Sequence, residues 1–255
     1  MKSALITGAN KSIGFETARS LLKQGYFVFL GSRNLNNGLK AAERLRADGL
    51  TEVEVVQLDV TDDRSVMAAR AFVENKTDRL DVLINNAGIN GGVELTDSGE
   101  VAGFKTATGT PIYIFKEVFD TNLYGVVRVT QAFLDLLKAS SEPRIVNVSS
   151  SSGSLTLHSD PQWWAYDHKD AVYLPSKTAL NMYTVVLAYE LRHTAFKINA
   201  VDPGFTSTDF NNHNGTGTAE VAAERIVKYA VIGSDGPTGK FFSDEYNPET
   251  GEIHW

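Results

Sequence analysis

The sequence contains no cysteine among its 255 residues. This absence excludes disulfides, thiolate zinc sites, iron–sulfur clusters and cysteine nucleophiles. The chain has only seven prolines, and they are scattered rather than gathered into a linker. No apolar stretch approaches the roughly 20 residues of a membrane span. No run of lysine or arginine is present either, so the sequence favours neither a membrane protein nor a nucleic-acid-binding protein with a basic stripe.

The composition that remains is that of an ordinary globular protein. Hydrophobic residues make up 42%, charged residues 22%, and the formal net charge is −7; such values argue against disorder. The first residues include one lysine and an apolar run too short for a signal sequence, so we expect a cytoplasmic protein. The five histidines show no metal-ligand spacing, and no metal site is expected.

Short apolar segments of strand length alternate along the chain with longer segments of helical periodicity. The expected strands are Ser3–Thr7, Tyr26–Gly31, Val53–Leu58, Leu80–Asn85, Arg144–Ser149, Lys197–Val201 and a weaker Gly239–Phe242. The expected helices include Ile13–Gln24, Leu39–Asp48, Val118–Ser140 and Tyr173–His193. This alternation predicts an α/β fold, with a doubly wound parallel sheet of about seven strands covered by helices. No repeat or composition break divides the chain, so we expect one domain over residues 1–255.

A glycine-rich turn follows the first expected strand and leads into the first expected helix. Its sequence is Gly8-Ala9-Asn10-Lys11-Ser12-Ile13-Gly14. Backbone N–H groups at such a helix N-terminus can approach a pyrophosphate, where the helix dipole favours negative charge. Gly14 would permit close packing of the helix on the sheet. The turn therefore indicates a dinucleotide site, with an ordinary turn as the alternative.

The end of the second strand indicates which dinucleotide is bound. Folds that select NAD place an acidic residue there to hold the ribose 2′-hydroxyl, whereas this chain has Gly31-Ser32-Arg33-Asn34. A guanidinium suits a 2′-phosphate through charge-assisted, bidentate hydrogen bonds, and Lys11 adds a second cation. We expect NADP(H); the alternative is that both cations are solvated surface charges.

Tyr173 and Lys177 are four residues apart, which places them on one face of a helix. No other tyrosine in the chain is followed by lysine at this spacing. A free phenol titrates near pH 10, and a nearby cation moves its pKa toward working pH. Tyr173 could then donate a proton to a carbonyl oxygen or accept one from an alcohol. One hydroxyl of the preceding run Ser149-Ser150-Ser151-Ser152 could hydrogen-bond the same oxygen.

Taken in order, these motifs resemble the short-chain dehydrogenase/reductase family, particularly its NADPH carbonyl-reductase-like branch. The resemblance runs from Gly8 to Gly204 and includes Asn85-Asn86-Ala87-Gly88, Tyr173 with Lys177, and Pro203-Gly204. It implies a single Rossmann-type domain. The turn departs from the family pattern at its middle glycine, which is Ser12 here. If this position needs only a small N-capping residue, serine can replace glycine, and this is the case that we expect. If the position instead needs a positive φ, serine would distort the pyrophosphate-binding turn.

The resemblance also implies roles for individual residues. Tyr173 is the proton donor, and Lys177 lowers the pKa of Tyr173 and holds the ribose of the cofactor. Ser150 orients the carbonyl group of the substrate, with Ser149 as the alternative for this role. Asn122 holds a water molecule that links Lys177 to solvent. The adenine contacts would come from Asp59 and Val60, although Asp59 could equally be a turn residue. Asn85 is expected to be structural. The remaining cofactor contacts implied are Asn86, Ala87, Gly88, Pro203, Gly204, Thr206 and Thr208, and Tyr173 and Lys177 are expected to contact the cofactor as well.

Three expected loops are long: Ile89–Thr110, Ser151–Ala171 and Phe205–Thr218. Ser150 and Tyr173 are 23 residues apart, more than in most family members. The extra segment carries Trp163, Trp164, Tyr166, Asp167 and His168. It could be a plain surface loop, or a lid that favours bulky or aromatic carbonyl compounds. An insertion here covers a packing face in some carbonyl reductases, so a monomer is slightly favoured over a homo-oligomer.

The sequence therefore predicts an NADP(H)-dependent reductase of small-molecule ketones or aldehydes. One alternative is an NAD(H)-dependent alcohol or steroid dehydrogenase of the same fold. The other is a non-catalytic protein that retains the cofactor pocket for redox sensing or as a scaffold. The presence of all four residues Asn122, Ser150, Tyr173 and Lys177 argues against the second alternative.

Overall fold

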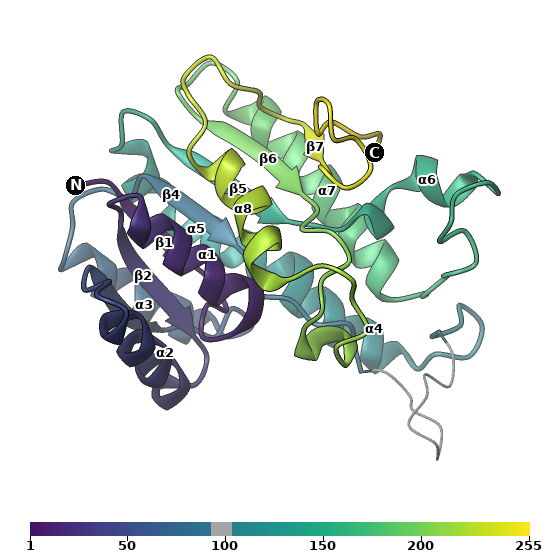
Figure 1. The fold of residues 1–255 in the computed structure, drawn as a ribbon, viewed down its shortest axis with the longest axis horizontal. Helices are drawn as coiled ribbons and strands as arrows, with labels where there is room; N and C mark the ends of the chain where they lie inside the picture. The colour runs from purple at the N-terminus through teal and green to yellow at the C-terminus, as the bar shows by residue number, and fades with distance from the viewer. Residues whose placement is uncertain (93–103) are drawn as a thin grey trace.

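Seven parallel strands form one sheet in the computed structural model of the protein, which describes residues 1–92 and 104–255 (Figure 1). The spatial order is β3-β2-β1-β4-β5-β6-β7, and each neighbouring pair is parallel. The strands are β1 Ser3–Ile6, β2 Phe27–Ser32, β3 Val53–Gln57, β4 Val82–Asn85, β5 Arg144–Val148, β6 Lys197–Val201 and β7 Phe241–Phe242. The predicted Rossmann-type, single-domain α/β fold is confirmed.

The helices lie between the strands along the chain, as the periodicity predicted. They are α1 Ser12–Lys23, α2 Leu35–Ala47, α3 Asp63–Glu74, α4 Ile112–Phe119, α5 Gly125–Lys138, α6 Leu155–Ser159, α7 Tyr173–Glu190 and α8 Ala219–Ala230. Helix α2 begins four residues before the predicted start, because the Asn34 side chain accepts the Asn37 N–H and caps it.

The helix predicted over Val118–Ser140 is present, but it begins at Ile112, ends at Lys138 and contains a π-helical turn that was not predicted. The chain forms α4, a π-helical turn over Asp120–Tyr124, and α5. A π-turn inserts one residue into the helical ladder, a change that hydrophobic periodicity does not encode. Gly125 follows this turn at a close approach, since a Cβ there would lie 2.7 Å from Val60 Cγ2.

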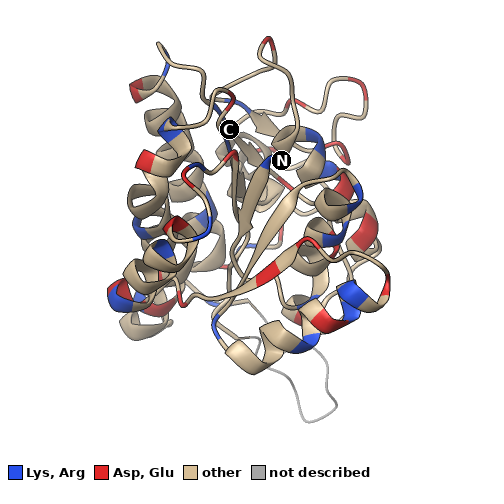
Figure 2. Ribbon diagram, turned by 90° about the vertical axis from the view of Figure 1, so that its left-hand side faces the viewer, with Lys and Arg blue, Asp and Glu red and all other residues tan. Residues whose placement is uncertain are grey.

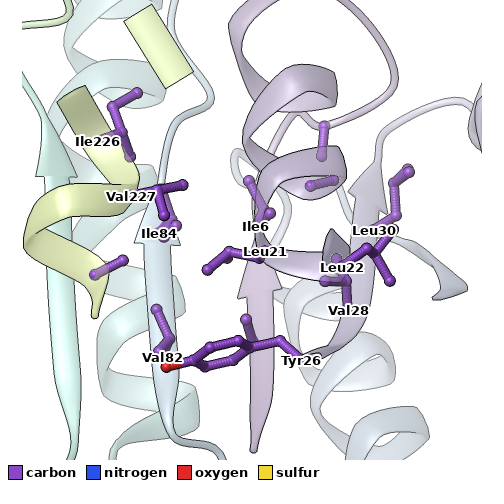
Figure 3. Close-up of a cluster of buried hydrophobic side chains, with 14 of the residues drawn as sticks. Ile6, Leu21, Leu22, Tyr26, Val28, Leu30, Val82, Ile84, Ile226 and Val227 are labelled. Atoms are coloured by element: carbon purple, nitrogen blue, oxygen red, sulfur yellow. The ribbon is translucent and has the colours of Figure 1, made fainter. Parts of the chain in front are cut away.

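Both faces of the sheet are buried because successive strand side chains point to opposite sides. Ile6 faces α1 and α8, whereas Leu5 faces α3, α5 and α7. Figure 3 shows Leu21 of α1 and Val227 of α8 meeting over β1 and β4. Fully burying one such side chain contributes about 1.5–3 kcal/mol to folding, which explains the near-continuous apolar character of the strands.

Charged residues lie mainly on the helices and loops around the sheet. In Figure 2 blue and red segments are interspersed along the helices, while the strands are mostly tan. Among residues 1–92 and 104–255, no helix combines the length and the apolar character needed to cross a bilayer.

The strand order fixes where function can be placed. The chain starts at β1, builds outward to β3, then returns to β4 on the other side of β1. Ligands of such sheets bind at this switch point, beyond the carboxyl ends of the strands. The segments that follow β1, β4, β5 and β6 all leave from this edge.

Candidate active site

The glycine-rich turn forms a cradle at the N-terminus of α1. Gly8 has φ +64°, and a Cβ on Gly14 would lie 2.6 Å from the Gly8 carbonyl oxygen and 2.5 Å from Asn86 Nδ2. Only glycine allows this approach. No side chain caps the first turn of α1, so its N–H groups point to the space where a pyrophosphate would lie. The turn fits a dinucleotide.

Ser12 shows that the expectation for this position is wrong. It is not an N-cap: Lys11 precedes the helix as the cap residue, and Ser12 has φ +49°. The position therefore requires the left-handed region, which glycine enters freely and serine enters at a cost of about 1 kcal/mol or more. The turn is formed despite this cost. Asn10 lies in the same turn, and Ile13 packs on the core beneath it.

Asn86 ties the cradle to the end of β4. Its Nδ2 donates to the Thr7 and Gly8 carbonyl oxygens at 2.9 and 3.1 Å. The backbone N–H groups of Asn86 and Ala87 both donate to the Thr7 hydroxyl. Asn85 instead lies in the sheet, where its Nδ2 donates to Asn147 Oδ1 at 2.9 Å. The expected division between a structural Asn85 and a cradle-side Asn86 matches this geometry.

The two predicted cations have different surroundings. Arg33 is exposed directly after β2, and the Ala9 N–H donates to the neighbouring Gly31 oxygen at 2.8 Å, which joins the strand end to the cradle. Lys11 is not a free cation: its Nζ lies 2.7 Å from Asp209 Oδ2. Both side chains of this pair are at least half exposed, so the pair contributes no more than about 1 kcal/mol. A phosphate could displace Asp209 at little cost.

Asp59 and Val60 lie beyond β3, at the same edge of the sheet. Asp59 Oδ1 accepts the N–H and the hydroxyl of Thr61 at 3.0 and 2.7 Å. Its carboxylate therefore stabilises the turn before α3, which was the alternative interpretation. Its contact with an adenine ring stays a prediction.

Tyr173 and Lys177 occupy the first turns of α7. Lys177 Nζ lies 5.7 Å from the centroid of the Tyr173 ring and donates to the Val148 carbonyl oxygen at 2.8 Å. The Ser150 hydroxyl forms a hydrogen bond with the Tyr173 phenol. Ser149 is committed elsewhere, since its hydroxyl donates to buried Asn181 Oδ1 at 2.6 Å. The structure thus brings Ser150, rather than Ser149, to the phenol.

Burial controls the protonation of the pair. It raises the pKa of the Tyr173 phenol, with the charges of Asp202 and Asp170 adding to the rise and the Ser150 bond opposing it. It lowers the pKa of Lys177 to about 8, against a raising effect of Asp202. The expected lowering of the phenol pKa by the ammonium does not dominate in this structure. A protonated phenol is the form that carbonyl reduction requires.

Asn122 joins the π-turn to α7 and to the segment after β4. Its amide pairs with the backbone of Ile89 in both directions, at 2.8 and 2.9 Å, and its Nδ2 donates to the Ser176 hydroxyl at 3.0 Å. A Cβ on Gly88 would lie 3.3 Å from Asn122 Oδ1 and 3.7 Å from Lys177 Nζ. Gly88 therefore lies where the cradle meets Lys177.

The Pro203-Gly204 turn leaves β6 at the same edge. Gly204 has φ +85°, and its N–H donates to Asp202 Oδ1 at 3.1 Å. Thr206 and Thr208 are buried beyond it, and Thr208 precedes a short 3-10 helix over Asp209–Asn211. The Lys11–Asp209 pair joins the residue after Thr208 to the cradle. The contact of Thr206 and Thr208 with a nicotinamide stays a prediction.

Three functional neighbours were missed by sequence reasoning. Asp170 accepts the backbone N–H of Tyr173 at 2.7 Å and so starts α7; an aspartate before a helix could have been noticed as a start signal. The Phe210 ring lies edge-on to Tyr173, with centroids 5.4 Å apart, and no sequence pattern indicates this contact. Asp202 directly precedes the Pro203-Gly204 turn, but its burial is visible only in the fold.

The insertion after Ser150 docks beside the site. Trp164 Nε1 donates to the Tyr246 hydroxyl at 2.9 Å, and the Trp164 and Phe205 rings are 6.3 Å apart. Tyr246 in turn forms a hydrogen bond with Ser151, next to Ser150. Trp163 also lies against Tyr246, with centroids 6.1 Å apart.

The other residues of the insertion make local contacts. His168 packs on Trp164 and Phe104, and Lys169 lies over the Tyr166 ring, while Asp167 accepts the backbone N–H of Lys169 through its carbonyl oxygen. Within the described ranges, no three His, Asp or Glu side chains gather as metal ligands.

The insertion leaves an apolar row on α7 uncovered. Met182, Val186 and Tyr189 are all exposed along this helix. The expectation of a monomer assumed that the insertion covers a packing face, and α7 gives that assumption no support. The monomeric state stays a prediction.

Comparisons with known proteins identify the family of the chain. The sequence model described as short chain dehydrogenase matches residues 2–218. A (+)-neomenthol dehydrogenase of Capsicum annuum is 35% identical, over 94% of each chain. The structure of salutaridine reductase from Papaver somniferum superposes with a TM-score of 0.80 at 31% identity, covering 96% of this chain and all of the other.

A third similar protein is the NADPH-bound carbonyl reductase from chicken fatty liver. Its structure gives a TM-score of 0.80 at 26% identity and covers 100% of this chain and 99% of its own. The family match, the shared fold and the juxtaposed tyrosine, lysine and serine agree. The chain belongs to the short-chain dehydrogenase/reductase family of oxidoreductases.

Proposed function

We propose that the protein is an NADP(H)-dependent reductase of ketones or aldehydes. The observation that carries the proposal is the convergence of Ser150, Tyr173 and Lys177 beside the dinucleotide cradle. These side chains come from the end of β5 and from α7, and Gly88 links them to the cradle. A protein that only binds the cofactor has no need of this arrangement.

A dinucleotide held by the cradle would supply hydride from its nicotinamide to a carbonyl carbon. Tyr173 and Ser150 would hold the carbonyl oxygen between two hydroxyl donors, aimed where negative charge develops. Tyr173 then donates its proton to that oxygen, and the burial that keeps its phenol protonated favours this direction. The Lys177 ammonium stabilises the phenolate that remains.

The choice of NADP(H) rests on Arg33 and on the absence of an acidic residue after β2. Arg33 follows a strand end that is hydrogen-bonded to the cradle, which suits a 2′-phosphate. The solved carbonyl reductase with the same fold is described as NADPH-bound. Lys11 would add a second cation once its exposed pair with Asp209 exchanges.

We propose bulky or aromatic carbonyl compounds as substrates. Trp164, Phe205, Tyr246 and Phe210 lie around Tyr173 and the Ser150 turn. Aromatic side chains bind flat apolar molecules by stacking and area burial. Two similar proteins are named for neomenthol and salutaridine, which fits substrates larger than simple alkyl ketones.

Replacing Trp164 by alanine tests the substrate class. Trp164 is 58% exposed and anchored by Tyr246, so the fold should tolerate the change. We expect KM for aryl ketones to rise about tenfold, because stacking and buried area are lost, and KM for small alkyl ketones to change little. Steady-state kinetics on both classes measure the difference.

The matched control for this experiment is Leu155→Ala. Leu155 lies on α6 in the same insertion and is also exposed, but it makes none of the aromatic contacts above. The Leu155→Ala variant should have the wild-type KM for both aryl ketones and small alkyl ketones. Equal kinetics of the Trp164 variant and the wild type on aryl ketones would remove the insertion from the substrate site.

The function itself is tested by NADPH and NADH oxidation across aryl ketones, keto esters, quinones and steroids. We expect turnover with several carbonyl compounds and a clear preference for NADPH. Efficient use of NADH with alcohol oxidation would instead identify the related NAD(H)-dependent dehydrogenase. Cofactor binding without turnover on any substrate would favour a non-catalytic protein.

A further inference from the structure

Asp202 is a carboxylic acid buried beside the catalytic residues, with no role in the mechanism above. It follows the last residue of β6 and is 3% exposed. Burying an unpaired carboxylate in a protein is costly. A buried carboxylate is tolerated only if neighbouring groups stabilise it or if its charge serves the function of the protein.

Each hydrogen-bond partner found for the Asp202 carboxylate donates to it. The Ser243 hydroxyl donates to Oδ2 at 2.8 Å, the Gly204 N–H donates to Oδ1 at 3.1 Å, and the Ser151 N–H adds a third bond. Two of these are backbone N–H groups, which cannot accept. Burial raises the pKa of Asp202, and these donors oppose the rise. The donor set suits an ionised carboxylate.

The position of Asp202 relates it to both catalytic groups. Lys177 Nζ donates to the carbonyl oxygen of Val148, and Val148 pairs with Val201, the residue before Asp202. The Ser151 bond fixes the 3-10 turn that Ser150 begins. Asp202 therefore contacts the turn that carries Ser150, and it directly follows the strand residue that pairs with the Lys177-bound Val148.

Among the described residues, Glu245 and the phenol of Tyr246 are further titratable groups that interact with Asp202. The charge of Glu245 acts on Asp202, and Arg225 Nη1 lies 3.1 Å from the Glu245 carboxylate and neutralises it. Asp170, whose charge acts on Tyr173, is paired with Lys105 at 3.5 Å. Both of these carboxylates have a cationic partner, so within the described part of the chain Asp202 is the carboxylate whose charge acts on the buried ammonium.

We propose that Asp202 is a positioning residue, a buried anion that holds the proton on Lys177 and fixes the turn that carries Ser150. This inference rests on the proposed reductase function. Its negative charge favours the ammonium form of Lys177 and disfavours the phenolate of Tyr173. Both effects keep Lys177 and Tyr173 protonated at higher pH, and carbonyl reduction requires these protonated forms.

The test is the pH profile of kcat/KM for carbonyl reduction in Asp202→Asn. Removing the negative charge lowers the pKa of both Lys177 and Tyr173, so activity should be lost at lower pH than in the wild type. We expect the midpoint of the alkaline limb to move down by about one pH unit. In alcohol oxidation, the rise in activity with pH should move in the same direction.

Two further variants make the result decisive. Asp202→Glu keeps the charge and should restore the midpoint, even if its longer side chain reduces turnover. Asp202→Ser is a second neutral variant, needed because an asparagine amide would face backbone donors and could prevent folding. A purely structural role would lower turnover in the neutral variants and leave the midpoint unmoved, which would overturn the inference.

The wild type separates this inference from the function on which it rests. A wild-type enzyme that reduces carbonyl compounds, together with an unmoved midpoint in both neutral variants, overturns only the role of Asp202. If the wild-type protein does not oxidise NADPH with any of the carbonyl compounds tested, the proposed function is overturned, and this inference is overturned with it.

Discussion

Tyr173→Phe is expected to lower kcat for carbonyl reduction about 10³-fold, since a positioned general acid contributes roughly 10²–10⁴. The ring remains, so its edge contact with Phe210 should persist. Lys177 keeps its bond to Val148 and the cradle is untouched. Cofactor affinity should therefore stay within about twofold. NADPH oxidation gives kcat, and quenching of protein fluorescence gives the cofactor Kd.

The matched control is Tyr189→Phe, on the same helix but exposed to solvent. It removes the same hydroxyl from α7 and should leave kcat near the wild-type value. Residual activity of Tyr173→Phe above a tenth of the wild type would assign the proton to another donor. Loss of cofactor binding in the same variant would mean that the phenol holds the nicotinamide rather than the substrate.

Arg33→Asp is expected to reverse the cofactor preference. The change removes a charge-assisted contact worth about 1.5–3 kcal/mol and puts a carboxylate where a 2′-hydroxyl can be held. It also repels a 2′-phosphate. The ratio of kcat/KM for NADPH over NADH should fall by on the order of 100-fold, or about 2.7 kcal/mol. Initial rates with each cofactor at fixed ketone concentration measure the ratio.

Lys40→Asp is the control for net charge in that experiment. Lys40 is an exposed cation on α2, the helix that follows Arg33, and its replacement changes the charge by the same amount. It should leave the ratio nearly constant. An unchanged ratio in Arg33→Asp would show that Arg33 is a surface charge and that selectivity comes from elsewhere.

The sequence was sufficient to predict the fold because a buried strand appears in the sequence as a short run of apolar residues. Leu5 and Ile6 point to opposite faces and both are fully buried, so β1 reads as a short apolar run. The helices bury one side only, and this gives their periodicity. The positions of Gly8, Gly14, Tyr173 and Lys177 were predictable for a similar reason, since backbone approach and helical spacing act between near neighbours in sequence.

The remaining features of the site arise from contacts between distant segments. Lys11 pairs with Asp209, and Tyr173 contacts Phe210; both contacts join segments that only the folded chain brings together. Ser12 adopts a positive φ that the shape of the turn imposes. The π-turn that carries Asn122 needs one extra residue in a helical ladder. Neither composition nor periodicity contains this information.

Transfer of deuterium from labelled NADPH tests the central claim most directly. NADPH carrying deuterium at C4 of the nicotinamide, prepared in each of its two stereochemical forms, is oxidised with an aryl ketone, and the alcohol is analysed by mass spectrometry. The account predicts that one of the two forms places a single deuterium on the carbinol carbon. Consumption of NADPH with unlabelled alcohol from both forms, or with no alcohol, would contradict it.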